Sequence, residues 1–68
     1  MDWKYYLEYS SANAPRADEA LYVLLDDDEY EIEYEAGTLI VYTNMDPMVL
    51  EQGIYEESGA YAENYGEY

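Results

Sequence analysis

The fold is decided by residues 29–43, which read EYEIEYEAGTLIVYT. In residues 29–36, a glutamate at every odd position alternates with a tyrosine, isoleucine or alanine at every even one. This period of two is typical of a strand with one buried face, because successive side chains point to opposite faces. Residues 39–43 form an apolar run rich in β-branched side chains, and Gly37 and Thr38 separate the two halves. The segment predicts an antiparallel hairpin whose register stays open, because its turn lacks an Asn-Gly or Asp-Gly pair.

The segments before this hairpin predict another strand and a helix. Residues 2–9 alternate in the same way, with aromatic and leucine side chains on one side, and therefore predict a strand. Residues 15–25 begin with a proline and carry alanines and leucines at the spacing of an apolar helical stripe, which predicts a helix. The alternative is a strand over residues 20–25 followed by a turn at residues 26–28, because this stretch also contains good strand formers.

The last third of the chain predicts a second helix. Asn44 or Asp46, followed by Pro47, marks its start. Three glycines interrupt the pattern farther on, and each costs about 1 kcal/mol relative to alanine inside a helix. We therefore expect a broken helix whose last ten residues fray. The residues that would line one face of a longer helix are Leu50, Ile54, Tyr61, Tyr65 and Tyr68.

Together these elements predict a single domain over residues 1–68 of the α+β class. It would contain a small antiparallel sheet of about three strands and one or two short helices, with a mostly β domain of four strands as the alternative. A disordered chain is not expected, because 50% of the residues are hydrophobic and 18% are aromatic. The 11 tyrosines provide more ring surface than a typical solvated tail contains.

The composition excludes most catalytic devices. The chain has no Cys and no His, so it offers no disulfide, thiolate nucleophile, Cys/His zinc site or imidazole base. The acidic run that begins at Asp26 lacks the glycine of an EF-hand calcium loop. We therefore expect no enzymatic activity, no metal and no cofactor. The longest apolar run, residues 21–25, is far shorter than the roughly 20 residues that span a bilayer. Membrane binding is not expected.

The charge is the strongest functional signal. The 17 acidic and two basic residues give a net charge of −15, which repels nucleic acids and anionic lipids. Solubility of a small domain needs a net charge of only about 2–8. Alternate residues of a strand lie about 6.6 Å apart, and phosphates of a nucleic-acid strand rise about 3.4 Å each along its axis and are farther apart along its contour. A row of carboxylates can thus approximate a row of phosphates. The candidate residues are Asp26, Asp27, Asp28, Glu29, Glu31, Glu33 and Glu35.

The tyrosines predict contact with a protein partner. Tyrosine is enriched at protein interfaces, and a core of this size cannot hide all 11 rings. The rings that we expect to meet a partner are Tyr6, Tyr61, Tyr65 and Tyr68.

In its small size, extreme acidity, aromatic richness and lack of Cys and His, the whole chain resembles the phage-encoded DNA-mimic inhibitors, which include several anti-CRISPR proteins and inhibitors of restriction enzymes. These mimics differ widely in fold, so the resemblance assigns no residue a role by position. It implies an inhibitor that occupies the basic nucleic-acid channel of a bacterial defence protein, with a CRISPR–Cas effector as the first choice, and blocks target DNA. It also implies the cytoplasm of an infected bacterial host.

Two other functions fit the composition. One alternative is an acidic domain of a halophile. The other is an antitoxin or a regulator that binds another basic protein. The abundant aromatic surface is not required by the first of these alternatives.

Overall fold

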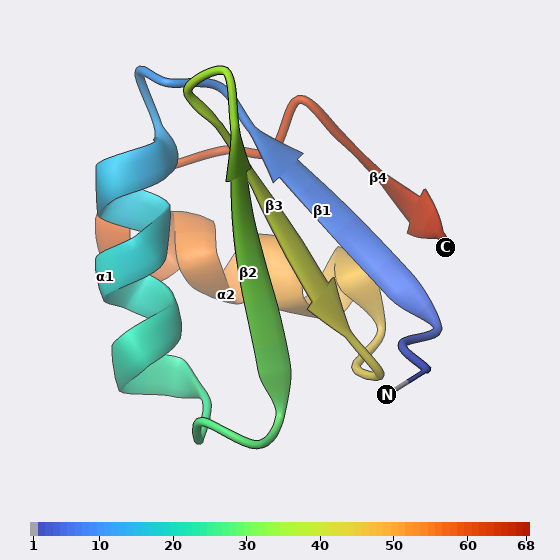
Figure 1. The fold of residues 1–68 in the computed structure, drawn as a ribbon. Helices are drawn as coiled ribbons and strands as arrows, with labels where there is room; N and C mark the ends of the chain where they lie inside the picture. The colour runs from blue at the N-terminus through green and yellow to red at the C-terminus, as the bar shows by residue number, and fades with distance from the viewer. Residues whose placement is uncertain (1) are drawn as a thin grey trace.

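The computed structural model describes residues 2–68, and within this range four strands form one sheet and two helices pack on one side of it (Figure 1). The predicted α+β class is confirmed. The elements in chain order are β1 (Tyr5–Tyr9), α1 (Ala14–Leu24), β2 (Tyr30–Glu35), β3 (Thr38–Thr43), α2 (Pro47–Ser58) and β4 (Asn64–Glu67).

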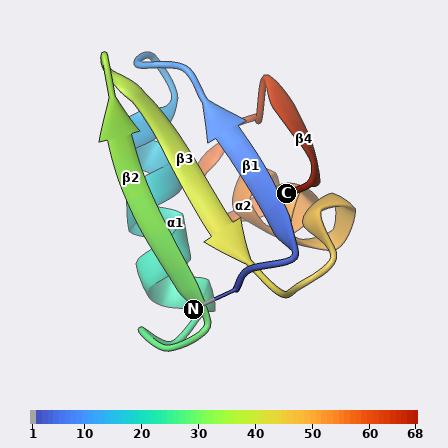
Figure 2. The same cartoon turned by 45° about the vertical axis from the view of Figure 1, so that its right-hand side comes forward.

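The sheet is antiparallel throughout, with the strand order β2-β3-β1-β4, which Figure 2 shows from left to right. The two central strands, β3 and β1, are paired on both sides, whereas β2 and β4 form the edges. In the register, Leu7 of β1 lies opposite Val41 of β3 and Tyr65 of β4. This order places the glutamate-rich strand at the rim of the sheet.

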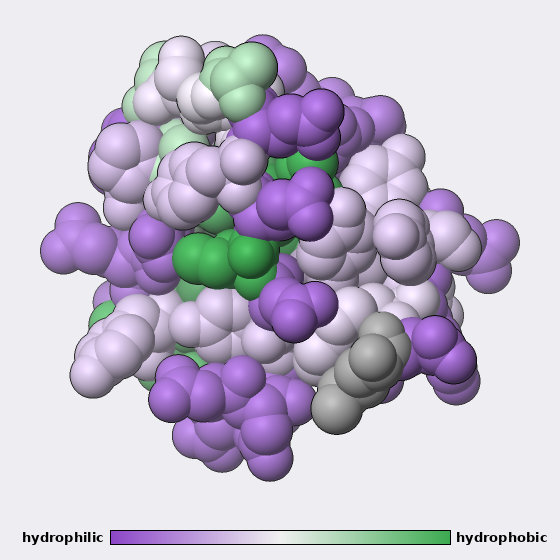
Figure 3. Space-filling view, in the orientation of Figure 1, coloured by the Kyte–Doolittle hydropathy of each residue, from purple (hydrophilic) through white to green (hydrophobic). Residues whose placement is uncertain are grey.

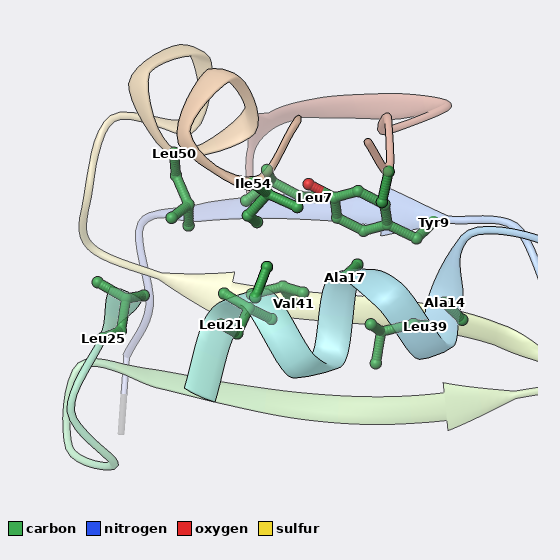
Figure 4. Close-up of a cluster of buried hydrophobic side chains, with 12 residues drawn as sticks. Leu7, Tyr9, Ala14, Ala17, Leu21, Leu25, Leu39, Val41, Leu50 and Ile54 are labelled. Carbon is green, nitrogen blue, oxygen red and sulfur yellow. The ribbon is translucent and has the colours of Figure 1, made fainter. Parts of the chain in front are cut away.

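The hydrophobic core lies between the sheet and the helices (Figure 4). The central strands supply the sheet side of the core, and both helices cover it with small or branched aliphatic side chains. Burial of such side chains is the main stabilising term in a domain of this size. The largest contributors are Leu7, Tyr9, Leu21, Leu39, Val41, Leu50 and Ile54.

The first helix is confirmed over its strand alternative. α1 spans Ala14–Leu24, and its buried face consists of three alanines and Leu21. Among the helices and strands, α1 packs most extensively against α2. The second helix begins as predicted, because the Asp46 side chain accepts a hydrogen bond from the backbone N–H of Met48 across 2.9 Å and Pro47 follows it.

The second helix breaks at Gly59, one of the glycines expected to interrupt it, but the residues that follow form a strand where a frayed helix end was expected. Gly59 adopts a left-handed conformation, with φ of 78°, and its N–H bonds the carbonyl of Tyr55, which ends the helix after Ser58. The chain then returns along β1, where β4 pairs with it as the fourth strand.

The β2–β3 turn settles the register that the sequence left open. Its two central residues, Ala36 and Gly37, have φ values of 52° and 85°, as a tight two-residue hairpin turn requires. Glu35 lies opposite Thr38, and the pairing continues from there along both strands.

Neither helix within residues 2–68 has the length and apolar character needed to cross a bilayer.

Candidate functional site

The face of the sheet that the helices leave uncovered is the candidate site, and we call it the open sheet face. Its residues follow from the register, because they alternate with the buried Leu7 and Val41 on the central strands. One row across the sheet joins Glu31, Tyr42, Tyr6 and Gly66. The full set comprises Glu31, Glu33 and Glu35 on β2, Thr38, Ile40 and Tyr42 on β3, Tyr6 and Glu8 on β1, and Asn64 and Gly66 on β4.

An acidic row runs along the β2 rim of this face. The three glutamates occupy alternate positions and are all exposed, so their backbone positions are about 6.6 Å apart. The aspartates of the α1–β2 loop are also exposed and extend the negative charge past the end of the strand. Hydrophilic side chains gather over β2 and at the lower end of the molecule in Figure 3, where Figure 1 places this loop. We call the row the acidic stripe: Asp26, Asp27, Asp28, Glu31, Glu33 and Glu35.

Glu29 serves the turn instead of the stripe. Its carboxylate Oε1 accepts a hydrogen bond from the backbone N–H of Asp26 across 2.8 Å, and its own N–H donates to the Asp26 carbonyl across 2.9 Å. These two bonds close the loop before β2 begins at Tyr30. The Glu29 side chain therefore helps to fix the conformation of the loop that carries the three aspartates.

Glu31 is held from outside the hairpin. The indole Nε1 of Trp3 donates a hydrogen bond to Glu31 Oε2 across 3.2 Å. The segment before β1 is fixed in turn by Asn44, whose Oδ1 accepts the backbone N–H of Lys4 across 2.9 Å. The stripe thus has one carboxylate that is oriented by a side-chain hydrogen bond.

The predicted partner-binding tyrosines divide into two groups. Tyr6 lies on the open sheet face, and the ring of Tyr68 reaches the same face, where its centroid is 4.8 Å from that of Tyr42. Tyr65 lies opposite the buried Leu7, so it points to the helical side. Tyr61 is exposed in the link between α2 and β4. The structure therefore brings only Tyr6 and Tyr68 to the face that carries the glutamates.

Sequence reasoning missed Tyr42 as a site residue. It lies in the centre of the open sheet face, opposite Glu31 on one side and Tyr6 on the other. The available signal was the alternation in residues 39–43, which becomes informative only when the hairpin register is known. Ile40 and Asn64 join the same face for the same reason.

The electrostatics of Tyr42 show how closely the carboxylates surround it. Burial raises the pKa of its hydroxyl, and the negative charge of Glu33 raises it further. Smaller contributions in the same direction come from Tyr68, Glu35 and Glu8. Carboxylates on two non-adjacent strands, β2 and β1, thus act on a single ring in the middle of the face.

The acids are unevenly distributed over the molecule. Seven of the 17 acidic residues lie between Asp26 and Glu35. Arg16, one of the two basic residues, donates to Asn13 Oδ1 across 2.8 Å at the start of α1, so its charge lies on the helical side. Within residues 2–68 no group of three acidic side chains converges closely enough to hold a metal ion. The stripe is an extended row of negative charges.

No known protein family matches this chain, and no curated protein matches its sequence. The functional argument therefore rests on the open sheet face itself. That face presents regularly spaced carboxylates on a strand that is paired on one side, next to tyrosine rings. Such a surface is complementary to a basic surface that carries Arg and Lys side chains.

Proposed function

We propose that the protein is a DNA-mimic inhibitor that occupies the basic nucleic-acid-binding surface of a bacterial defence protein, with a CRISPR–Cas effector as the target, and blocks the binding of target DNA. The observation that carries the proposal is the acidic stripe, in which three carboxylates follow one face of the edge strand β2 at regular spacing. The proposed activity is binding alone, and the protein performs no catalysis.

The hairpin supports this role because it aligns the charges before a partner arrives. β2 is paired with β3 along its whole length, and the turn register fixes which side chains share a face. A mimic built on a flexible segment would lose conformational entropy when it binds. Carboxylates held on a strand keep more of their interaction energy with the Arg and Lys side chains that otherwise contact phosphate.

The net charge supports the same role because electrostatic attraction acts over a long distance. A charge of −15 on an object of about 27 × 25 × 19 Å attracts a cationic groove from a distance and speeds encounter. The same charge repels DNA, so the inhibitor does not bind the nucleic acid that it displaces. Inhibition should therefore weaken as ionic strength rises.

A competition experiment tests the proposal. A CRISPR–Cas effector loaded with its guide RNA is incubated with labelled target DNA, and the purified protein is added at increasing concentration. We expect the DNA to be displaced, and we expect no complex between the protein and the DNA alone. The double variant Glu31→Lys/Glu33→Lys should require at least about tenfold more protein for the same displacement, because two charge-assisted contacts are reversed.

The matched control is Glu56→Lys/Glu57→Lys at the C-terminal end of α2, where both side chains are exposed. Each double variant replaces two acids by two lysines and so changes the net charge from −15 to −11. If the two variants lose the same amount of inhibition, net charge alone is responsible and the stripe is not the site. If a panel of effectors and restriction enzymes keeps its DNA in the presence of the protein, the proposed function is wrong.

A further inference from the structure

The open sheet face contains a shallow pocket beside the acidic stripe. It has a volume of about 230 Å³ and lies over the two central strands. Tyrosine rings provide most of its wall, one aliphatic side chain contributes to its surface, and one carboxylate faces it. We call it the tyrosine pocket; its lining is Tyr6, Glu8, Ile40, Tyr42 and Tyr68.

The rings of the tyrosine pocket are fixed by contacts within the protein. Tyr42 and Tyr68 meet edge to face, with an interplanar angle of 61°. A Cβ at position 66 would lie 3.7 Å from the ring of Tyr6, which is ordinary van der Waals contact, so this ring lies against β4. The hydroxyl of Tyr6 accepts a hydrogen bond from Asn64 Nδ2 across 3.2 Å. The ring faces are thus positioned before any ligand enters.

The negative charge of the pocket is also oriented. The same Asn64 Nδ2 donates to Glu8 Oε1 across 3.1 Å, which ties this carboxylate to the pocket wall. On the other side, Glu33 and Glu35 are near enough to Tyr42 to act on its hydroxyl. The Asn64 amide therefore holds the ring of Tyr6 and the carboxylate of Glu8 side by side. The pocket thus combines a flat aromatic surface with a negative charge.

We propose that the tyrosine pocket binds the guanidinium group of an arginine side chain from the basic partner. The existence of such a partner rests on the proposed function. The guanidinium is planar, so it stacks on tyrosine faces, and its donors match the two oxygens of a carboxylate. In this arrangement the acidic stripe attracts the basic surface and the tyrosine pocket anchors one of its arginines.

Other occupants fit the site less well. A phosphate or a nucleotide would meet the charges of Glu8, Glu33 and Glu35. An apolar side chain would remove water from Glu8 without giving it a charged partner. A lysine would satisfy the charge, but its ammonium group is compact and strongly hydrated and cannot stack as a plane. The pocket is therefore expected to prefer arginine over lysine.

Two peptides of equal length and charge test this preference. Nona-arginine and nona-lysine are titrated into the protein by calorimetry at about 0.15 M salt, where long-range attraction acts on both and is partly screened. We expect nona-arginine to bind about three- to tenfold more tightly. Tyr42→Leu and Tyr68→Leu should each remove most of this preference and change the affinity for nona-lysine by less than about twofold.

The matched control is Tyr55→Leu, which removes an exposed tyrosine from α2 on the helical side and should retain the preference. Tyr68 is 75% exposed, so its substitution leaves the core intact and keeps the test valid if Tyr42→Leu does not fold. Equal binding of the two peptides by the unmodified protein overturns the proposal. A preference that survives Tyr68→Leu also overturns it.

The DNA competition experiment separates this proposal from the proposed function. If the protein distinguishes arginine from lysine through Tyr68 but displaces no DNA, the pocket stands and the DNA-mimic function fails. If DNA is displaced and the two peptides bind equally, the function stands and the pocket assignment fails.

Discussion

Trp3 Nε1 donates a hydrogen bond to Glu31 Oε2, and this bond distinguishes Glu31 from Glu33, its neighbour in the acidic stripe. Glu31 is partly compensated by a donor, whereas Glu33 lies between two like charges on the same face. Two unit charges about 7 Å apart in water repel each other by about 0.6 kcal/mol. The middle carboxylate should therefore be the more destabilising of the two.

Glu33→Gln should raise the free energy of unfolding by about 0.5–1 kcal/mol at 10 mM salt. Glu31→Gln should raise it less, because the variant loses the charge assistance in the bond from Trp3. Urea unfolding followed by circular dichroism measures both, and in 0.5 M salt the difference should shrink as the charges are screened. Equal gains for the two variants, or a gain that persists at high salt, would contradict this assignment.

The stability of the unmodified protein should rise with salt over the moderate range. Its 17 acids repel one another with few basic residues to offset them, and screening reduces that repulsion. We expect a folded circular dichroism spectrum at 0.15 M NaCl and a higher melting temperature at 0.5 M. A halophilic domain would instead be unfolded in both buffers and would fold only in molar salt. That outcome would favour the halophile alternative over the inhibitor.

The hairpin and the first helix were predictable from the sequence because their signals are local. The alternation in residues 29–36 and the apolar stripe of residues 15–25 specify elements that depend little on distant partners. The acidic face of β2 was predictable for the same reason. β4 was not, because the sequence NYGE is short and contains no β-branched residue. It is a strand because the edge of β1 is free to pair with it. Tyr5 and Glu67, which lie opposite each other, are separated by almost the whole length of the sequence.

The composition of the open sheet face depended on that same nonlocal pairing. Tyr42, Tyr6 and Gly66 form one row only because β1 lies between β3 and β4. No pattern within a single strand predicts which aromatic ring will lie beside which glutamate. The acidic stripe could therefore be predicted from the sequence, whereas predicting the tyrosine pocket required knowledge of the strand order.

The β2–β3 turn offers a stabilising substitution. Ala36 has φ of 52°, in the left-handed region where its Cβ is strained, by roughly 1 kcal/mol. Ala36→Asn or Ala36→Gly should raise the free energy of unfolding by about 0.5–1 kcal/mol, because asparagine and glycine accept this conformation more readily. The control is Gly37→Ala, which places a Cβ at φ of 85° and should lower it by about 1 kcal/mol. Destabilisation by both substitutions at position 36 would contradict the turn geometry.

The buried Tyr9 offers a second stabilising substitution. Its side chain is fully buried among Leu7 and Ile54 (Figure 4), and its hydroxyl has no hydrogen-bond partner within residues 2–68. A buried hydroxyl that loses water without gaining a partner costs about 1–3 kcal/mol. Tyr9→Phe should therefore raise the free energy of unfolding by about 1 kcal/mol at pH 7, measured by urea unfolding. A loss of stability would show that the hydroxyl has a partner after all.

The same hydroxyl should make the protein sensitive to alkaline pH. Burial, together with the negative charge of Glu51, raises the pKa of Tyr9 above the ordinary value of about 10. Above about pH 10 the unfolded chain releases this proton while the folded protein retains it, so the folded state binds more protons and stability falls as pH rises. The contribution of Tyr9 is intact below about pH 10 and declines by up to about 1.4 kcal/mol per pH unit above it.

Tyr9→Phe removes the hydroxyl whose proton makes stability depend on pH. The raised pKa values of Tyr30, Tyr34 and Tyr42 affect the unmodified protein and the variant equally. The stabilising effect of Tyr9→Phe should therefore be constant from pH 7 to pH 9 and grow between pH 10 and pH 11. Urea unfolding at each pH measures it, and Tyr55→Phe, at an exposed site, is the control that should show no such growth. An advantage that stays flat through pH 11 would mean that folded Tyr9 ionises as readily as a tyrosine in water.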